Sequence, residues 1–296
     1  MPQRRLSHNA YRLIAAMEIL DEEHQPLPQL SGDTNIYNLG IINNHNVVIA
    51  GLPKPGNCSA ATVVTQMRMT FPRLQYVLLV GIGGGMPVKT EYGPVRLGHV
   101  VVNQPTGIHS GAIQYDHGKA QTGLFERKGK ISVRCHRYDH DPVREDIQRI
   151  RTDRLAFHRF AFPGSANDHL YQSDYTHRQD GVSCEEGGCD PKQRIHRPID
   201  AGHDSLTVVH RGTIASGELV LKDAKLRDAL DKEHGVLCFE MEAAGALTDF
   251  PCMVIRGISD YCDSHKNDLW QGYAAAVAAA YARQLLFHIL ILETRR

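Results

Sequence analysis

Short runs of branched aliphatic residues alternate with helical segments along this chain, and this alternation constrains its fold more than any other feature. Runs of this length that are rich in Val, Ile and Leu are typical of strands buried on both faces of a sheet. The runs are VVIAGL (47–52), YVLLVGI (76–82), HVVVN (99–103), VLCFE (236–240) and CMVIRGI (252–258). The helical segments are 11–24, 58–71, 222–234, 241–249 and 267–292. We therefore predict an α/β fold with helices on both faces of the sheet.

The segment from 134 to 204 interrupts this alternation. Its hydrophobic runs disappear, histidines and arginines crowd together, and SCEEGGCDP at 183–191 has the composition of an irregular loop. The strand-like run SLTVVH follows at 205–210. We therefore interpret the segment as an insertion into a single domain that covers residues 1–296.

The charge balance favours a small-molecule partner. Lys plus Arg and Asp plus Glu number 33 each, so the chain has no bulk positive field for a nucleic acid polymer or an anionic membrane. Seven cysteines, an odd number spread over a long chain, are not the pattern of a small disulfide-rich secreted protein. The apolar stretch 274–292 contains Arg283, Gln284 and His288, which favours a buried helix over a membrane span. We expect a cytoplasmic protein.

The run VLLVGIGGGMP at 77–87 ends an apolar strand in four glycines within five residues. Gly81 to Pro87 contains no Lys followed by Ser or Thr in the spacing G-x-x-x-x-G-K-[ST], which excludes a Walker A loop. A dinucleotide fingerprint starting at Gly81 would have Met86 in its last glycine position and Pro87 at the helix start, which argues against that motif too. A glycine turn remains, either packed against a neighbouring helix or cradling a ligand with its N–H groups.

Carboxylates stand at the ends of two of the expected strands. In FEMEAAG (239–245), Glu240 and Glu242 follow the apolar run, where burial is costly unless something pairs them. A ribose diol is one such partner, and the start of the following helix is another. In RGISDYCDSHKN (256–267), Asp260 lies just past a strand, where ligands gather in open α/β sheets and where a helix cap would also stand.

Several ordered runs extend these signals across the chain. They are LDEEH, LVGIGGGMP, VRLGHVVVNQPTG, QYDHGK, GTIASG, CFEMEAAG and SHKNDLWQGYAAA. In this order they resemble the nucleoside phosphorylases and nucleosidases, most closely the phosphorylase-like domains of fungal NTPase and ankyrin receptor proteins. The resemblance covers about Asn38 to Leu286. It implies a three-layer αβα sandwich whose central mixed sheet is partly barrel-like, no cofactor, and a homo-oligomer.

The resemblance implies roles for the carboxylates. Glu242 would grip both ribose hydroxyls and Met241 would pack on the sugar, with Glu240 beside them. Asp260, preceded by Ser259, would protonate or hydrogen-bond N7 of a purine. Breaking the N-glycosidic bond builds positive charge on the ribose and negative charge on the base, so these groups would stabilise opposite ends. Burial must then raise the pKa of Asp260, while Glu242 must stay ionised.

Two further segments would contact the ligand according to the same resemblance. GTIASG at 212–217 would line the base, or else form an ordinary strand and turn. The glycine run would hold the nucleophile, which is phosphate in phosphorylases and water in nucleosidases. The residues expected at the base are Ile214, Ala215 and Ser216, and those expected at the nucleophile are Gly83, Gly84 and Gly85.

The chain departs from the family pattern at three positions. Leu79 and Ile82 replace the arginine and serine of the bacterial-type phosphorylases, and neither side chain binds a phosphate dianion. We therefore predict water as the nucleophile, unless another arginine such as Arg68 or Arg96 takes over. Arg12 falls where nucleosidases carry a glutamate that positions the water.

Other residue clusters carry less weight. The spacings x6, x4 and x6 between His177, Cys184, Cys189 and His196 permit a structural zinc site in the insertion. Zinc clusters more often contain C-x2-C, so we predict no metal among the site residues. No G-x-S-x-G elbow supports a serine hydrolase.

Basic residues in loops are expected on the solvated surface. Near the 5′ end of the sugar they would instead accept phosphates, which would make nucleotides, including ATP, substrates. The residues in question are Lys54, Lys89, Arg96 and Lys266.

We thus predict a purine nucleosidase in which Asp260 activates the base and Glu242 holds the ribose. A phosphate-dependent purine nucleoside phosphorylase is the first alternative. A non-catalytic nucleoside or nucleotide sensor is the second, because Arg12 and the lack of a convincing first strand weaken the chain as a catalyst.

Overall fold

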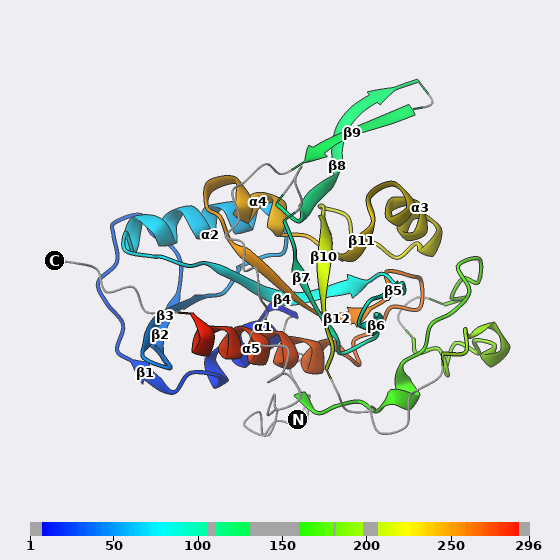
Figure 1. The fold of residues 1–296 in the computed structure, drawn as a ribbon, viewed down its shortest axis with the longest axis horizontal. Helices are drawn as coiled ribbons and strands as arrows, with labels where there is room; N and C mark the ends of the chain where they lie inside the picture. The colour runs from blue at the N-terminus through cyan, green and yellow to red at the C-terminus, as the bar shows by residue number, and fades with distance from the viewer. Residues whose placement is uncertain are drawn as a thin grey trace.

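A seven-stranded mixed sheet runs through the centre of the computed structural model, which describes residues 8–105, 110–122, 124–130, 160–179, 182–197 and 207–289. The strand order is β11–β4–β12–β7–β10–β8–β9 (Figure 1). The strands are β4 (Leu78–Gly85), β7 (Val100–Asn103), β8 (Ala112–Gln121), β9 (Leu124–Lys130), β10 (Val209–Ser216), β11 (Val236–Glu240) and β12 (Met253–Asp260).

Strand β10 closes part of this sheet into a ring. It pairs in parallel with β7 through its first half, and with β8 and β11 through its second half. The β10–β11 pairing, in which Ser216 lies opposite Glu240, completes a ring of β11, β4, β12, β7 and β10. Parallel and antiparallel pairs both occur in the ring. The predicted mixed, partly barrel-like sheet is confirmed.

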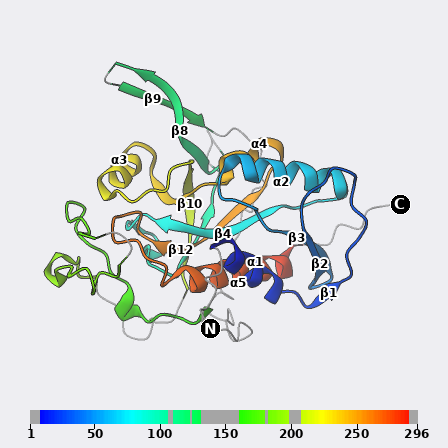
Figure 2. The same cartoon turned by 180° about the vertical axis from the view of Figure 1, so that it is seen from behind.

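Helices cover both faces of the sheet (Figures 1 and 2). On one side lie α2 (Asn57–Thr70) and α4 (Ala243–Asp249), and on the other lie α1 (His8–Glu18) and α5 (Gln271–His288). Helix α3 (Ala224–His234) precedes β11, begins at the capping side chain of Asp223 and ends at the left-handed Gly235. These layers form the predicted αβα sandwich, and the helix predicted over 222–234 is present with nearly the same bounds.

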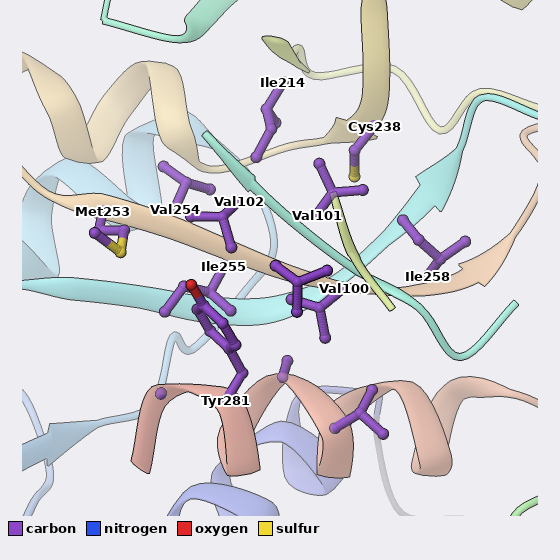
Figure 3. Close-up of a cluster of buried hydrophobic side chains, with 14 of the residues drawn as sticks. Val100, Val101, Val102, Ile214, Cys238, Met253, Val254, Ile255, Ile258 and Tyr281 are labelled. Carbon is purple, nitrogen blue, oxygen red and sulfur yellow. The ribbon is translucent and has the colours of Figure 1, made fainter. Parts of the chain in front are cut away.

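The core lies between the sheet and α5. Val100, Ile255 and Tyr281 belong to one buried cluster that joins β7, β12 and α5 (Figure 3). Helix α5 is alanine-rich and buried along most of its length, as predicted, so that it packs closely on the sheet: a Cβ at Gly257 of β12 would overlap the Ala274 carbonyl oxygen. Among the described residues, no helix has the length and apolar character that crossing a membrane requires.

The glycine run differs from the prediction because it is a strand and not a turn. Strand β4 continues through Gly85 and is paired with β12 on one side and β11 on the other. The strands approach closely there: a Cβ at Gly83 would lie 2.8 Å from the Phe239 carbonyl oxygen, and a Cβ at Gly84 would lie 2.8 Å from Asp260 Oδ1. The glycines are required because any side chain would separate these strands.

Two further arrangements of strands were not predicted, although the first includes most of the run predicted as a strand at 47–52. A three-stranded meander precedes α2, with a hairpin turn at Asn43 and Asn44, both of which have positive φ. The second is the β8–β9 hairpin, which projects beyond the body of the molecule (Figure 1). The meander strands are β1 (Glu22–His24), β2 (Tyr37–Ile42) and β3 (His45–Ala50), and a short pair is formed by β5 (Lys89–Thr90) and β6 (Gly93–Pro94).

The described part of the insertion is irregular, as its composition indicated. It contains the short 3-10 helices η4 (Ser165–Asn167) and η5 (Pro191–Gln193), joined by turns. The remaining residues of the interval 134–204 lie outside the described residues. The beginning of the strand predicted at 205–210 also lies outside them, and β10 starts at Val209.

Candidate functional site

The two carboxylates predicted to act on opposite ends of a nucleoside lie on neighbouring parts of the sheet. Gly84 of β4 is paired with Phe239 of β11 on one side and with Asp260 of β12 on the other. Glu242 follows the end of β11 by two residues. The structure therefore brings Glu242 and Asp260 to one end of the ring, separated by the glycine strand.

Glu242 is held by two arginines. Its side chain is buried, with Oε2 lying 3.2 Å from Arg256 Nη2 and Oε1 lying 3.6 Å from Arg12 Nη1. Burial alone raises the pKa of Glu242, but the charges of Arg256 and Arg12 outweigh burial and hold this pKa below its usual range. An ionised carboxylate is what the sugar-binding role requires.

Glu240 has a different environment. Its carboxylate accepts hydrogen bonds from the backbone N–H groups of Glu242 and Ala243, at 3.0 Å each, and also pairs with Arg256. It is fully buried at the start of α4, where the N–H groups lack partners within the helix. This geometry assigns Glu240 to the helix-start role that the sequence left open, and it fixes the backbone of Glu242.

Arg256 is the residue of this cluster that sequence reasoning missed. It lies inside β12, its side chain is 1% exposed, and it joins both glutamates. A signal was present, because an arginine inside the apolar run CMVIRGI is tolerated only if it is paired. Gly81 leaves space for it, since a Cβ at this position would overlap Arg256 Nη1.

Arg12 of α1 lies where the family resemblance implies a glutamate, and the structure places it against Glu242. Its Nε is buried and has no hydrogen-bond partner among the described residues. Burial lowers the pKa of Arg12, an effect that Glu242 opposes. The two other arginines considered for an anion are engaged elsewhere: Arg96 pairs with Asp168 at 3.1 Å, and Arg68 lies over the Phe250 ring at 4.9 Å.

Asp260 is buried and surrounded by donors. Its Oδ2 lies 2.9 Å from Lys266 Nζ and accepts a 2.9 Å hydrogen bond from Ser259 Oγ, while its Oδ1 accepts a 3.0 Å bond from the Cys262 N–H. Burial alone raises the pKa of Asp260, but Lys266 and these hydrogen bonds outweigh burial and hold the pKa below its usual range. The raised pKa that a general acid requires is therefore not present in this arrangement.

Lys266 does not lie on the solvated surface where the sequence analysis placed it. The sequence placed it on the solvated surface with Lys54 and Lys89, and those two are exposed. The Lys266 side chain is only 26% exposed and forms an ion pair with Asp260. Sequence spacing could not show this, because the two residues meet only through the fold of the loop between β12 and α5.

The residues predicted to line the base lie beside the glutamates. Ile214 and Ala215 are completely buried in β10. Ser216 Oγ donates to Asn57 Oδ1 at 3.2 Å and accepts a 3.0 Å bond from the Ala244 N–H, so it also supports the start of α4. Met241 is partly exposed between Glu240 and Glu242, as a residue that packs on a sugar must be.

A group of metal-ligating side chains lies next to this site, but it is not the predicted set. His177, Cys184 and Cys189 are joined by His265 of the β12–α5 loop, with all four ligand atoms within 4.8 Å of one another. His196 is not part of the group. The sequence pattern led to the wrong fourth residue because His265 is 76 positions from Cys189 in the chain.

The ring and its covering helices define a nucleoside phosphorylase-like fold. Solved structures that share it include futalosine hydrolase of Helicobacter pylori, with a TM-score of 0.57, and 5′-methylthioadenosine/S-adenosyl homocysteine nucleosidase of Helicobacter pylori, with a TM-score of 0.55. Each is 17% identical to this chain, and each comparison covers 94% of both chains. The resemblance predicted from the sequence is confirmed.

Curated proteins of two kinds are similar in sequence. A nucleotide-binding leucine-rich repeat (NLR)-like protein of Hyaloscypha variabilis is 40% identical over 93% of this chain, and ATP nucleosidase Cap17 of Escherichia coli is 25% identical over 81% of it. The chain spans 28% of the length of the first and 41% of the second. No family model matches the chain.

Proposed function

We propose that this chain is an N-glycosidase that hydrolyses the bond between ribose and adenine in a nucleoside or nucleotide. The observation that carries the proposal is that the two strand ends next to Glu242 and Asp260 pair with the same residue, Gly84, from its two sides. Similarity to an ATP nucleosidase supports the reaction and the substrate class, and the fold shared with methylthioadenosine nucleosidase supports an adenine base.

Glu242 supplies the sugar end of this mechanism. Its carboxylate, ionised by Arg256 and Arg12, accepts hydrogen bonds from the 2′ and 3′ hydroxyls while Met241 packs on the ribose. As the glycosidic bond lengthens, positive charge develops on the sugar, and a fixed negative charge stabilises it more than it stabilises the ground state. Glu240 and Arg256 keep the carboxylate in position.

Asp260 acts at the base end through its pairing with Lys266. When N7 of the purine approaches Asp260, Lys266 moves from the carboxylate, and burial then raises the pKa of Asp260. The carboxyl group takes up a proton from solvent in this way and gives it to N7 as the bond between C1′ and N9 breaks. The oxygen of a water molecule then bonds to C1′, and that water releases one proton to solvent. Lys266 is thus a positioning residue that sets the charge of the general acid.

Adenine release in phosphate-free buffer tests the proposal. Purified protein is incubated with adenosine, methylthioadenosine, AMP or ATP, and products are separated by liquid chromatography. We expect adenine and the free sugar or sugar phosphate from at least one substrate, and none from the Glu242→Gln variant. The proposal is overturned if none of these substrates releases adenine, or if the Glu242→Gln variant releases adenine as fast as the wild type.

Phosphorolysis is a second candidate, and Arg12 favours it. Its buried Nε has no partner among the described residues, and its guanidinium lies 3.6 Å from the carboxylate assigned to the ribose. A phosphate dianion at the sugar would supply such a partner. In this case adenine release requires added phosphate, the sugar leaves as a 1-phosphate, and Arg12→Gln abolishes adenine release in the presence of phosphate. This alternative is excluded if adenine is released in phosphate-free buffer and the Arg12→Gln variant releases it at a rate within about tenfold of the wild-type rate.

A sensor remains the alternative to any enzyme. It predicts that a nucleoside or nucleotide raises the melting temperature while no base is released.

The proposal also includes a cytoplasmic homo-oligomer. The six described cysteines are free thiols, which supports a reducing compartment, and light scattering on the purified chain measures the oligomeric state.

A further inference from the structure

Four metal-ligating side chains meet where the insertion contacts the loop that carries Lys266. His177, Cys184 and Cys189 come from the insertion, and His265 precedes Lys266 in the β12–α5 loop. Their ligand atoms lie within 4.8 Å of one another. Two sulfurs and two imidazoles so arranged are a frequent ligand set of structural zinc.

The distances fit a tetrahedral ion. Cys184 Sγ lies 3.5 Å and Cys189 Sγ lies 3.7 Å from His265 Nδ1. Zinc bonds of about 2.3 Å to sulfur and about 2.0–2.1 Å to nitrogen place the two ligands about 3.6 Å apart in a tetrahedron. The observed separations therefore match edges of a zinc coordination sphere.

His265 is oriented as a metal ligand. Its Nε2 lies 3.1 Å from the Tyr175 carbonyl oxygen, which accepts the ring proton and leaves the Nδ1 lone pair facing the two sulfurs. The ring is stacked on Tyr171, with centroids 3.8 Å apart and an interplanar angle of 14°. This second contact fixes the plane of the imidazole.

His177 provides an independent indication. Its Nε2 is buried and has no hydrogen-bond partner among the described residues. A buried imidazole nitrogen without a partner is costly, and a metal ion would satisfy it. Coordination through Nε2 places the ring proton on Nδ1, so the 3.2 Å contact from the Gln179 N–H to that atom would be given up.

The local backbone holds the two cysteines on one turn. The Cys189 N–H donates a 2.9 Å hydrogen bond to the Cys184 carbonyl oxygen, which closes the turn between them. Gly188 within it has a φ of +64°, which favours glycine. A Cβ at Gly187 would lie 2.8 Å from His177 Cε1, so only glycine lets the imidazole approach.

We propose that His177, Cys184, Cys189 and His265 bind one zinc ion, which fastens the insertion to the β12–α5 loop. The same contact is reinforced by a 2.8 Å hydrogen bond from the His177 N–H to Ser264 Oγ. Zinc would thereby restrain the segment that presents Lys266 to Asp260. This link to the reaction rests on the proposed function, whereas zinc binding does not.

Metal analysis of the purified chain tests the site. The protein is loaded with zinc, desalted and measured by inductively coupled plasma mass spectrometry. We expect about one zinc per chain, falling below about 0.1 in the Cys184→Ser/Cys189→Ser double variant. His196→Ala and Cys58→Ser are matched controls from outside the group, and both should keep the ion.

Cobalt substitution gives a second readout. Cobalt in the wild type should show the intense charge-transfer absorption of thiolate ligands and the visible bands of a tetrahedral site, and the double variant should show neither. A wild type that binds no zinc and gives no such spectrum overturns the proposal, as does a metal that the double variant retains or that His196→Ala loses. A Cys184–Cys189 disulfide found by mass spectrometry in freshly purified protein also overturns it.

These outcomes are separable from those of the proposed function. Metal content and spectra need no substrate. Adenine can therefore be released by a chain that binds no zinc, and zinc can be bound by a chain that releases no base. If both hold, the double variant should retain adenine release with a lowered kcat and a changed pH profile, because the Lys266 loop has lost its anchor.

Discussion

The two ends of the candidate site solve the same problem in different ways. Glu242 and Asp260 are both buried carboxylates kept ionised by a cation. The main cation at Glu242 is Arg256, which is 1% exposed inside a strand of the ring. The cation at Asp260 is Lys266, which is 26% exposed on a loop. The charge of Glu242 is therefore held by a cation inside the sheet, whereas the charge of Asp260 is held by a cation on a loop.

This difference corresponds to what the two ends must do in an N-glycosidase. A carboxylate that stabilises a cationic sugar must not change its charge during the reaction, and a rigid arginine inside the sheet ensures this. A general acid must gain and lose a proton, and a lysine on a loop permits this. Variants that exchange or remove the two cations test the contrast.

Arg256→Met is expected to have the largest effect. It leaves Glu240 and Glu242 buried without their shared cation, which should lower the free energy of unfolding by about 3–5 kcal/mol. Urea denaturation followed by circular dichroism measures the change. Arg283→Met is the matched control: it removes an ion pair to the partly exposed Asp21, a hydrogen bond to the Ile19 carbonyl oxygen and the contact with the Phe287 ring, and should cost about 1–2 kcal/mol. Equal losses in the two variants would show that Arg256 is not the fixed cation.

Asp260→Asn should leave the fold intact and reduce adenine release by about 10²–10⁴-fold, because the amide cannot deliver a proton to N7. The amide oxygen can still accept the hydrogen bond from the Cys262 N–H, so the melting temperature should change little. Steady-state kinetics on the best substrate measures kcat. A variant with unchanged kcat would remove Asp260 from the mechanism.

Lys266→Met should shift the pH dependence rather than abolish turnover. Lys266 lowers the pKa of Asp260, and the protonated acid is the active form, so activity falls as pH rises through this pKa. Without the ammonium group the pKa of Asp260 in the free enzyme rises, so the basic limb of the kcat/KM profile should move to higher pH. The exposed Lys54→Met is the control. A limb that stays in place, or moves downward, contradicts the assignment of Lys266 as a displaceable cation.

The sequence predicted the strands and the carboxylates at their ends better than it predicted the contacts between them. Apolar runs defined β11 and β12 because buried strands need continuous hydrophobic residues, and the carboxylates at their ends were found because such groups are costly when buried. Arg256 was missed even though it lies in one of those runs, since its partners follow another strand. The glycine run was predicted as a turn because composition does not reveal that two strands press on it from both sides.

The metal-ligating group shows the same limit. Local spacing selected His177, Cys184 and Cys189, but it also selected His196, which is near in the chain and not in the group. His265 belongs to a different motif and reaches the cysteines only because the insertion folds back on the β12–α5 loop. A pattern within one segment cannot supply a ligand from another.

The glycine-rich strand β4, which lies between the strands that carry the two carboxylates, also limits the length of a ligand that contacts both of them. Adjacent strands are spaced by about 4.8 Å, so β11 and β12, as neighbours of β4, stand roughly 9–10 Å apart. Backbone geometry fixes this interval as long as β4 keeps its glycines. Selectivity among ligands of similar length must therefore reside in groups around the rim, and the interval itself should be among the last properties of the molecule to change.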